Sequence, residues 1–281
     1  METTHKNLRY LPFPVGKGND TASIADTQKL LDKAIALAWH TVKTDRTEDS
    51  RPPAFTPAQW VWQLAGAYHL THSYPPLIEK AAQGFERMGR KDLSQWATQK
   101  ATEERGHDRL ALLDIQSMGY KAEAVVEVLL PHTTKALVNY LTQRVQETDP
   151  IGCVGYSYTI ERIATSIKEK HIQSLEYQLP VGIRATRCLR VHSGIGNDVE
   201  HVKEIVAMVT ELAPQERIRV ATACYETALL EFNLSKEDYI LEEKLQYILR
   251  PLELCTHLQA RDEIHSDYNH RTSEKSISTA F

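Results

Sequence analysis

Four short patches of this sequence combine carboxylates and histidines in the way that metal sites of helical proteins do. Such proteins hold pairs of iron or manganese ions with carboxylates from separate helices and with carboxylate–histidine pairs one helical turn apart. Imidazole and carboxylate ligands also suit zinc, whereas carboxylate-rich sites disfavour copper. Three ligands for each of two ions would leave coordination positions open for oxygen and a substrate. The four patches are Glu103-Glu104 with His107, then Glu161, then His192, then Asp198 with His201.

The first two patches also have simpler interpretations. Residues three or four apart share one face of a helix, so Glu103 and Glu104 both point the same way as His107. A solvated charge cluster that includes the neighbouring arginines would give the same pattern. Glu161 adjoins an apolar stripe, so it lies either at the solvated edge of that stripe or buried with a partner.

The segment HSGIGNDVEH (192–201) is unusual for a helix. Asp198 and His201 lie one helical turn apart, but Gly194 and Gly196 interrupt what would otherwise be one helix over residues 181–212. Each glycine costs about 1 kcal/mol relative to alanine. The glycines indicate either a kink, bulge or unwound stretch, which often marks a functional site, or a plain loop with Asn197 or Asp198 as the next N-cap.

The pattern of apolar residues is helical nearly throughout the chain. Thr56 and Pro57 favour a helix start, as N-cap and first helical residue, and the Pro75-Pro76 pair should kink or interrupt that helix. Gly119 is typical of a C-terminal cap. The expected helices span 25–43, 57 up to the proline pair, 91–119, 131–147, 150–178, 180–193, 197–212, 214–232 and 234–262.

No segment alternates in the way that a sheet requires, so we predict an all-α protein with a single helical domain. Within residues 1–281, this domain would comprise an N-terminal arm (1–24), a helical bundle (25–262) and a flexible polar tail (263–281). Short polar termini without apolar periodicity are seldom held in place by packing.

Composition argues against several classes of protein. The net charge is −4, and acidic and basic residues are interspersed. The sequence therefore lacks the basic stripe that is typical of nucleic-acid binding. No apolar run approaches the roughly 20 residues that span a membrane, and the N-terminus lacks the apolar segment of a secretory signal, so a cytoplasmic location is expected. No serine-hydrolase, phosphate-loop or dinucleotide-binding motif occurs. Reduced buried thiols are expected for the widely spaced Cys153, Cys188, Cys224 and Cys255.

The order and spacing of the four patches resemble those of the heme-oxygenase-like diiron oxidases. That family includes fatty-acid decarboxylating oxidases, N-oxygenases of natural-product pathways and a chlamydial protein associated with death domains. EERGHDRL resembles its Glu–His element, Glu161 its glutamate on a later helix and HSGIGNDVEH its last element, and the similarity covers roughly residues 57–232. The family's last element reads HxxxDxxH, whereas His192 stands six residues before Asp198. Either the helix bulges to realign His192, or His192 is not a ligand.

The resemblance implies a single heme-oxygenase-like bundle of about seven core helices. It also implies an enzyme in which two Fe2+ ions per chain, or Mn2+, activate O2 and oxidise a small organic substrate, with sites that are often partly empty. The substrate would be an amino acid, a fatty acid or a natural-product intermediate, and the family allows a homodimer. One ion would be held by Glu104 (or Glu103), His107 and Glu161, with Glu161 able to bridge, and the other by His192, Asp198 and His201.

Three other functions fit parts of the sequence. A metal-free enzyme on the same fold, similar to thiaminase or to pyrroloquinoline-quinone synthase, is the first, and its thiaminase-like form would use a glutamate with a cavity thiol such as Cys153 or Cys188. A non-enzymatic helical interaction protein would expose an apolar stripe and would bury no cluster of titratable groups. Heme binding through one histidine, such as His69, is the third.

Further residues could contribute to a pocket. His69 and His72 lie one helical turn apart, although packed or exposed positions are the simpler interpretation. Arg184, Arg187 and Arg190 precede the third patch and are candidates to bind a substrate carboxylate. A solvated helix face explains the three arginines equally well, so the sequence leaves the substrate open.

Overall fold

The computed structural model describes residues 23–45, 55–196, 198–234, 238 and 240–254. This part of the chain forms twelve α-helices and contains no β-strand, which confirms the all-α prediction. Nearly all of the expected N-terminal arm, the whole tail and Cys255 lie outside the described residues. The helices are α1 (Ile24–Asp45), α2 (Pro57–Arg87), α3 (Lys91–Glu104), α4 (Asp108–Ser117), α5 (Ala122–Val128), α6 (His132–Gln146), α7 (Gly152–Ala164), α8 (Glu169–Gln178), α9 (Arg187–Val191), α10 (Asp198–Thr210), α11 (Pro214–Phe232) and α12 (Glu242–Leu249), followed by the 3-10 helix η3 (Arg250–Leu252).

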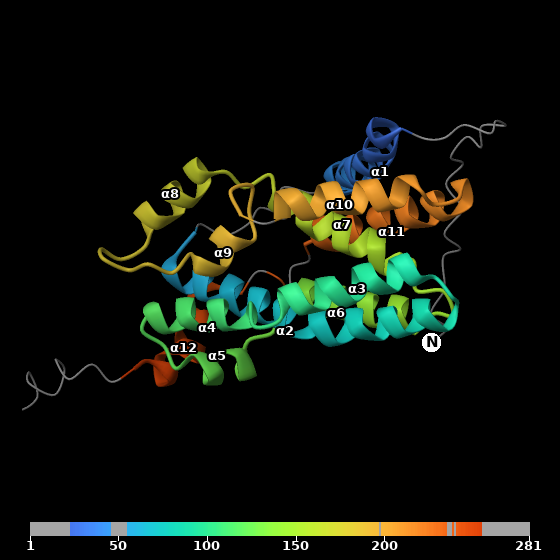
Figure 1. Cartoon of the computed structure of the whole chain (residues 1–281). Coiled ribbons are helices and arrows are strands. Elements are labelled where there is room, and N and C mark those ends of the chain that lie inside the picture. Colours follow the sequence, from blue (N-terminus) through green and yellow to red (C-terminus); the bar gives the residue numbers. More distant parts are fainter. Residues whose placement is uncertain (1–22, 46–54, 197, 235–237, 239, 255–281) are drawn as a thin grey trace, which may run out of the picture.

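The bundle has two parts, each with its own cluster of buried apolar side chains, and the long helix α2 runs through both (Figure 1). Its C-terminal half joins α1, α3, α6, α7, α10 and α11 in one cluster of buried apolar side chains. Its N-terminal half joins α4, α5 and α12 in a second cluster. The turn between α3 and α4 and the segment after α9 (192–196) lie between the two parts in Figure 1. None of the described helices combines the length and the apolar character that crossing a membrane requires.

The start of α2 is the one that the sequence predicts, whereas the predicted break in its middle does not occur. The side-chain oxygen of Thr56 accepts a hydrogen bond from the backbone N–H of Gln59 (3.1 Å), and Pro57 is the first helical residue. The Pro75-Pro76 pair does not interrupt the helix, which continues to Arg87, so the predicted interruption was wrong. Packing against α3, α4 and α6 on both sides of the pair outweighs the loss of two backbone hydrogen bonds.

Four expected helices are broken or shorter in the structure. The 91–119 helix breaks into α3 and α4 because Gly106 adopts a positive φ of 92°, which glycine tolerates best, although α4 does end just before Gly119 as expected. The 150–178 helix breaks at residues 165–168 into α7 and α8. Only Arg187–Val191 is helical in the 180–193 segment, and the described part of 234–262 is helical only over α12 and η3.

Candidate metal centre

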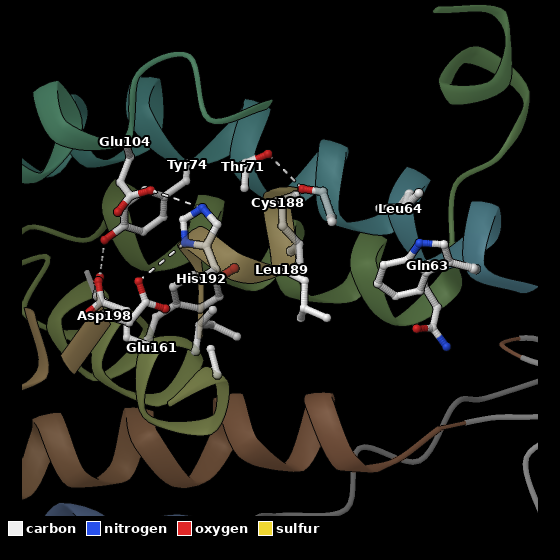
Figure 2. A pocket seen from close by; sticks show the side chains of 17 residues that line it. Gln63, Leu64, Thr71, Tyr74, Glu104, Glu161, Cys188, Leu189, His192 and Asp198 are labelled. Carbon is white, nitrogen blue, oxygen red and sulfur yellow. Dashed lines mark hydrogen bonds and ion pairs between the residues drawn. The ribbon is translucent and has the colours of Figure 1, made fainter. Parts of the chain in front are cut away.

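All six predicted ligands lie close together, and Figure 2 shows four of them at one end of a cavity. The three carboxylates and His201 are buried, whereas the other two histidines are partly buried. Segments far apart in the sequence therefore bring a carboxylate-rich set into the interior. The six residues come from the end of α3 (Glu104), the turn before α4 (His107), α7 (Glu161), the position after α9 (His192) and the first turn of α10 (Asp198 and His201).

The ligand atoms form two groups that share Glu104. The first half-site consists of Glu104, His107 and His192. Oε2 of Glu104 lies 2.8 Å from Nδ1 of His107 and 3.8 Å from Nε2 of His192. The second half-site consists of Glu104, Glu161 and His201, and Nδ1 of His201 lies 3.9 Å from Oε1 of each glutamate. This grouping differs from the one that the resemblance implies, because Glu104 rather than Glu161 stands between the groups.

Asp198 lies between the two half-sites and adds a further oxygen. Its Oδ1 atom is 3.5 Å from Nδ1 of His192 and 3.9 Å from Nδ1 of His201. Among the described residues, Asp198 Oδ1, Glu161 Oε2, His192 Nε2 and His201 Nδ1 are buried without a hydrogen-bond partner. Buried polar atoms are normally paired, and cations bound in the two half-sites would give such atoms partners. Carboxylate oxygens and imidazole nitrogens suit iron, manganese or zinc, so the residues fit a metal centre.

Glu103 and Glu104 both contribute to the site, in different ways. Glu104 faces the two half-sites, whereas Oε2 of Glu103 lies 3.4 Å from Nε2 of His201, the ring nitrogen on the far side from the second half-site. The other oxygen of Glu103 accepts a hydrogen bond from the Gln99 amide (2.8 Å). Metal-bound histidines commonly donate their second N–H to a carboxylate, which fixes the ring and its tautomer. Glu104 is thus the candidate ligand, and Glu103 supports His201.

His192 reaches the first half-site because the chain leaves the helix after α9 and forms a loop. A Cβ atom on Gly194 would collide with the backbone oxygen of Thr165, and one on Gly196 would collide with that of Val191. Glycine is therefore required at both positions by close backbone contacts. The structure thus contains the loop that was one of the two interpretations of this segment, and the loop accommodates the two extra residues before α10.

We expect Gly196→Ala to weaken metal binding at the first half-site and to destabilise the fold by about 1–3 kcal/mol, because the added methyl group must push the loop away from Val191. Gly119→Ala is the control away from the cluster: Gly119 has open space around it and a positive φ of 91°, which Gly196 does not have, so alanine there strains the backbone without a collision. Thermal unfolding and metal titration would separate the two variants. Unchanged metal affinity in Gly196→Ala would show that the loop does not hold His192 in place.

Lys100 is buried among these carboxylates, which the sequence did not indicate. Its side-chain nitrogen Nζ lies 2.7 Å from Oε1 of Glu161 and 3.8 Å from Oε1 of Glu104. Burial raises the pKa of Glu161 to about 8, although the Lys100 charge opposes this shift. Burial also raises the pKa of Glu104, but the hydrogen bond from His107 and neighbouring cationic groups bring it below its ordinary value.

His192 and His201 differ in their electrostatic surroundings. Burial lowers the pKa of His192, but Asp198 and Glu104 outweigh this effect and bring it above its ordinary value. Burial and then the Lys100 charge lower the pKa of His201, and the nearby carboxylates do not compensate. Metal binding requires the neutral imidazole, so His201 is already in the form that a metal ion needs.

The metal-ligand cluster closes one end of an apolar cavity of about 280 Å³. One face of α2 lines it, and Figure 2 shows Tyr74 near the carboxylates and Gln63 at the opposite end. Lining positions from 60 to 74 make this wall about 21 Å long at 1.5 Å per residue. Gln63 is exposed and marks the mouth, whereas the Tyr74 hydroxyl at the inner end hydrogen-bonds Ser157 (2.6 Å). No lysine or arginine is among the described residues that line the cavity.

His69 and His72 do not line this cavity. Nε2 of His69 lies 2.9 Å from the backbone oxygen of Val126, and His72 is exposed and pairs with Asp108 (2.8 Å). The packed or exposed interpretation of these histidines is therefore confirmed. Nothing at His69 favours the heme alternative, because its ring is engaged by the backbone of the α5 region.

The arginines before His192 are likewise not among the described residues that line the cavity. Arg187 pairs with the buried Asp114 (2.9 Å), and Arg190 pairs with Glu169 and Glu176 (3.0 Å each). These ion pairs hold the α8–α9 segment against α4 and against itself. A role for these side chains in binding a substrate carboxylate inside the cavity has no support from their positions.

Two of the cysteines were candidates for a catalytic thiol. Cys188 lines the cavity, whereas Cys153 is packed in the first apolar cluster. Burial raises the pKa of Cys188 to about 12, so its thiolate is scarce at neutral pH. Cys153, Cys188 and Cys224 are all buried and free, which confirms the expectation of reduced thiols for the described cysteines.

No protein-family model matches this chain, and no curated protein matches it. Two solved structures are similar to it along most of their length. A domain of unknown function with a heme oxygenase-like fold from Shewanella denitrificans OS217 is 24% identical, with a TM-score of 0.61, and the match covers 80% of this chain and 96% of that one. A TenA homolog from Pseudomonas syringae pv. tomato DC3000 is 12% identical, with a TM-score of 0.53 and coverage of 78% and 98%.

This chain has the heme-oxygenase-like helical fold. At these identities the similarity shows the fold alone, and it leaves the chemistry to be argued from the residues. The predicted fold class is thus confirmed, in the broader group that includes both neighbours. The arguments for a function rest on the two half-sites, Lys100 and the apolar cavity.

Proposed function

We propose that this protein is an O2-dependent oxidase or oxygenase that holds iron or manganese in its two half-sites. The observation that supports the proposal is the convergence of three buried carboxylates and three histidines, with unpaired atoms facing one another, at the closed end of an apolar cavity. When bound, reduced iron or manganese ions supply electrons to O2 and make it able to oxidise a substrate.

The residues of the chain have separate tasks in this proposal. Glu104 would hold ions in both half-sites, and Glu103 would keep the His201 ring in the orientation in which Nδ1 faces the second half-site. With three protein ligands each, and with Asp198 between them, the half-sites would leave coordination positions for O2 and the substrate. The Tyr74–Ser157 hydrogen bond and the apolar walls would exclude bulk water from the inner end of the cavity.

The cavity supports an elongated, largely apolar substrate. Its walls are mainly aliphatic and aromatic, and no lysine or arginine that could pair with a carboxylate is among the described lining residues. A free amino acid would bury an ammonium and a carboxylate there without partners, which is costly. We therefore expect a neutral or mostly apolar compound whose reacting atom enters beside Tyr74 and whose far end lies near Gln63.

We expect the chain to bind ferrous iron under anaerobic conditions and to consume O2 when it is admitted. After removal of unbound iron, the measurements are bound iron per chain, O2 uptake and the visible spectrum after rapid mixing. A transient visible absorption and uptake above that of free iron would support the proposal, and no bound iron above background would contradict it. Glu161→Ala and His201→Ala should abolish O2-dependent turnover while the helical circular-dichroism signal persists.

A metal-free enzyme with a nucleophilic thiol is the second candidate, since Cys188 does line the cavity. The raised pKa of this thiol disfavours it. Cys188→Ser distinguishes the two proposals, because it would abolish a thiol-dependent reaction and would leave iron binding and O2 uptake unchanged.

A further inference from the structure

Lys100 makes the two half-sites unequal. Its ammonium lies 2.7 Å from Oε1 of Glu161 and 3.8 Å from Oε1 of Glu104, and these are the oxygens that face Nδ1 of His201. The side chain is only 2% exposed, so water does not screen its charge. In the first half-site, the two histidines instead face the other oxygen of Glu104.

The charges of the site favour one divalent ion while Lys100 is protonated. The buried carboxylates of Glu104, Glu161 and Asp198 carry three negative charges when ionised. Lys100 and one divalent ion together carry three positive charges, so the cluster is then balanced. A second divalent ion would leave two excess positive charges in a buried site, or one if the nearby Glu103 is counted, and buried unpaired charge is costly.

We propose that Lys100 acts as an internal cation that competes with a metal ion for the second half-site. The first half-site then binds its ion tightly, and the second binds an ion weakly because that ion must displace the ammonium from Glu161 and Glu104. This inference rests on the proposed metal binding, and it names the residue that sets the number of ions bound. Lys100 is a positioning residue in this role, since it acts through the carboxylates.

Lys100→Met tests this role because methionine is of similar length and carries no charge. In a titration with Mn2+ under anaerobic conditions, with free Mn2+ followed by electron paramagnetic resonance, the wild type should bind one ion tightly and a second at least tenfold more weakly. In Lys100→Met the second ion should bind at least tenfold more tightly than in the wild type. Lys100→Arg keeps the charge and should keep the second ion weak. Lys91→Met, an exposed position on the same helix, should bind like the wild type.

The outcomes separate this inference from the proposed function. If no protein binds Mn2+ or Fe2+, the proposed function fails. If the wild type binds two ions equally tightly, metal binding stands and the role of Lys100 is overturned, whether or not the variants fold. If Lys100→Met folds, as judged by circular dichroism and thermal unfolding, and its second ion binds no more tightly than in the wild type, the role is also overturned.

Discussion

Replacing Glu104 with glutamine is expected to abolish metal binding at both half-sites, with at least a hundredfold loss of affinity for each ion. Glu104 is the residue that the two half-sites share, since His107 and His192 face one of its oxygens and His201 faces the other. Glutamine keeps the shape of the side chain but lacks the negative charge that a divalent cation requires. Anaerobic titration with Mn2+ or Fe2+, read as bound metal per chain, measures the loss.

Glu103→Gln is the matched control for this variant. The same substitution one residue earlier alters the carboxylate that faces His201 Nε2 at 3.4 Å and accepts a hydrogen bond from Gln99, and it leaves Glu104 intact. Loss of such a supporting carboxylate typically costs about 10- to 100-fold in metal affinity, so only the second half-site should weaken. If Glu104→Gln kept one ion at wild-type affinity, Glu104 would not be shared. If Glu103→Gln lost both ions, the assignment of the two glutamates would be reversed.

The existence of most helices could be predicted from the sequence, but their breaks could not. The Thr56–Pro57 start and the end near Gly119 have local causes, a side-chain cap and a glycine with positive φ, and both are confirmed. An interruption at the Pro75-Pro76 pair was wrongly expected because helix–helix packing, which periodicity does not show, outweighs the local penalty. Gly106 was overlooked because a single glycine inside a charged helical pattern is often tolerated.

The candidate ligands could be found from residue type and spacing. For Glu104 and His107, however, the side chains meet (at 2.8 Å) across a turn and not on one helix, as the spacing had suggested. The long gap between His192 and Asp198 left the role of His192 open. The loop that closes this gap depends on contacts of Gly194 with a segment near residue 165, which is distant in the sequence.

Lys100 and the cavity could not be predicted. Lysines on amphipathic helices are almost always solvated, so a buried one is visible only once the surrounding helices are in place. The same holds for the wall of α2. Apolar residues at spacings of three and four predict a buried face, and the sequence does not distinguish a face that contacts another helix from one that borders empty space.

A second large effect is expected when the cavity is filled from α2. Ala67 lies about midway along the lining, between Tyr74 at the inner end and Gln63 at the mouth. In Ala67→Trp the indole ring would occupy the middle of the cavity and separate the metal ions from the mouth. The fold should tolerate the change, because the added ring fills space and displaces no packed side chain. Metal binding should stay unchanged, since none of the six candidate ligands is touched.

Binding of a neutral apolar fluorophore, N-phenyl-1-naphthylamine, measures this effect without knowledge of the substrate. The wild type should bind the probe with enhanced fluorescence, and Ala67→Trp should bind it at least tenfold more weakly, because the apolar volume available to the probe is lost. Gln83→Trp, on the exposed face of the same helix, controls for the added tryptophan and should bind like the wild type. Wild-type probe binding in Ala67→Trp would show that apolar compounds bind elsewhere. Weak binding together with full metal loading would assign substrate entry to the wall of α2 and metal binding to the carboxylate end.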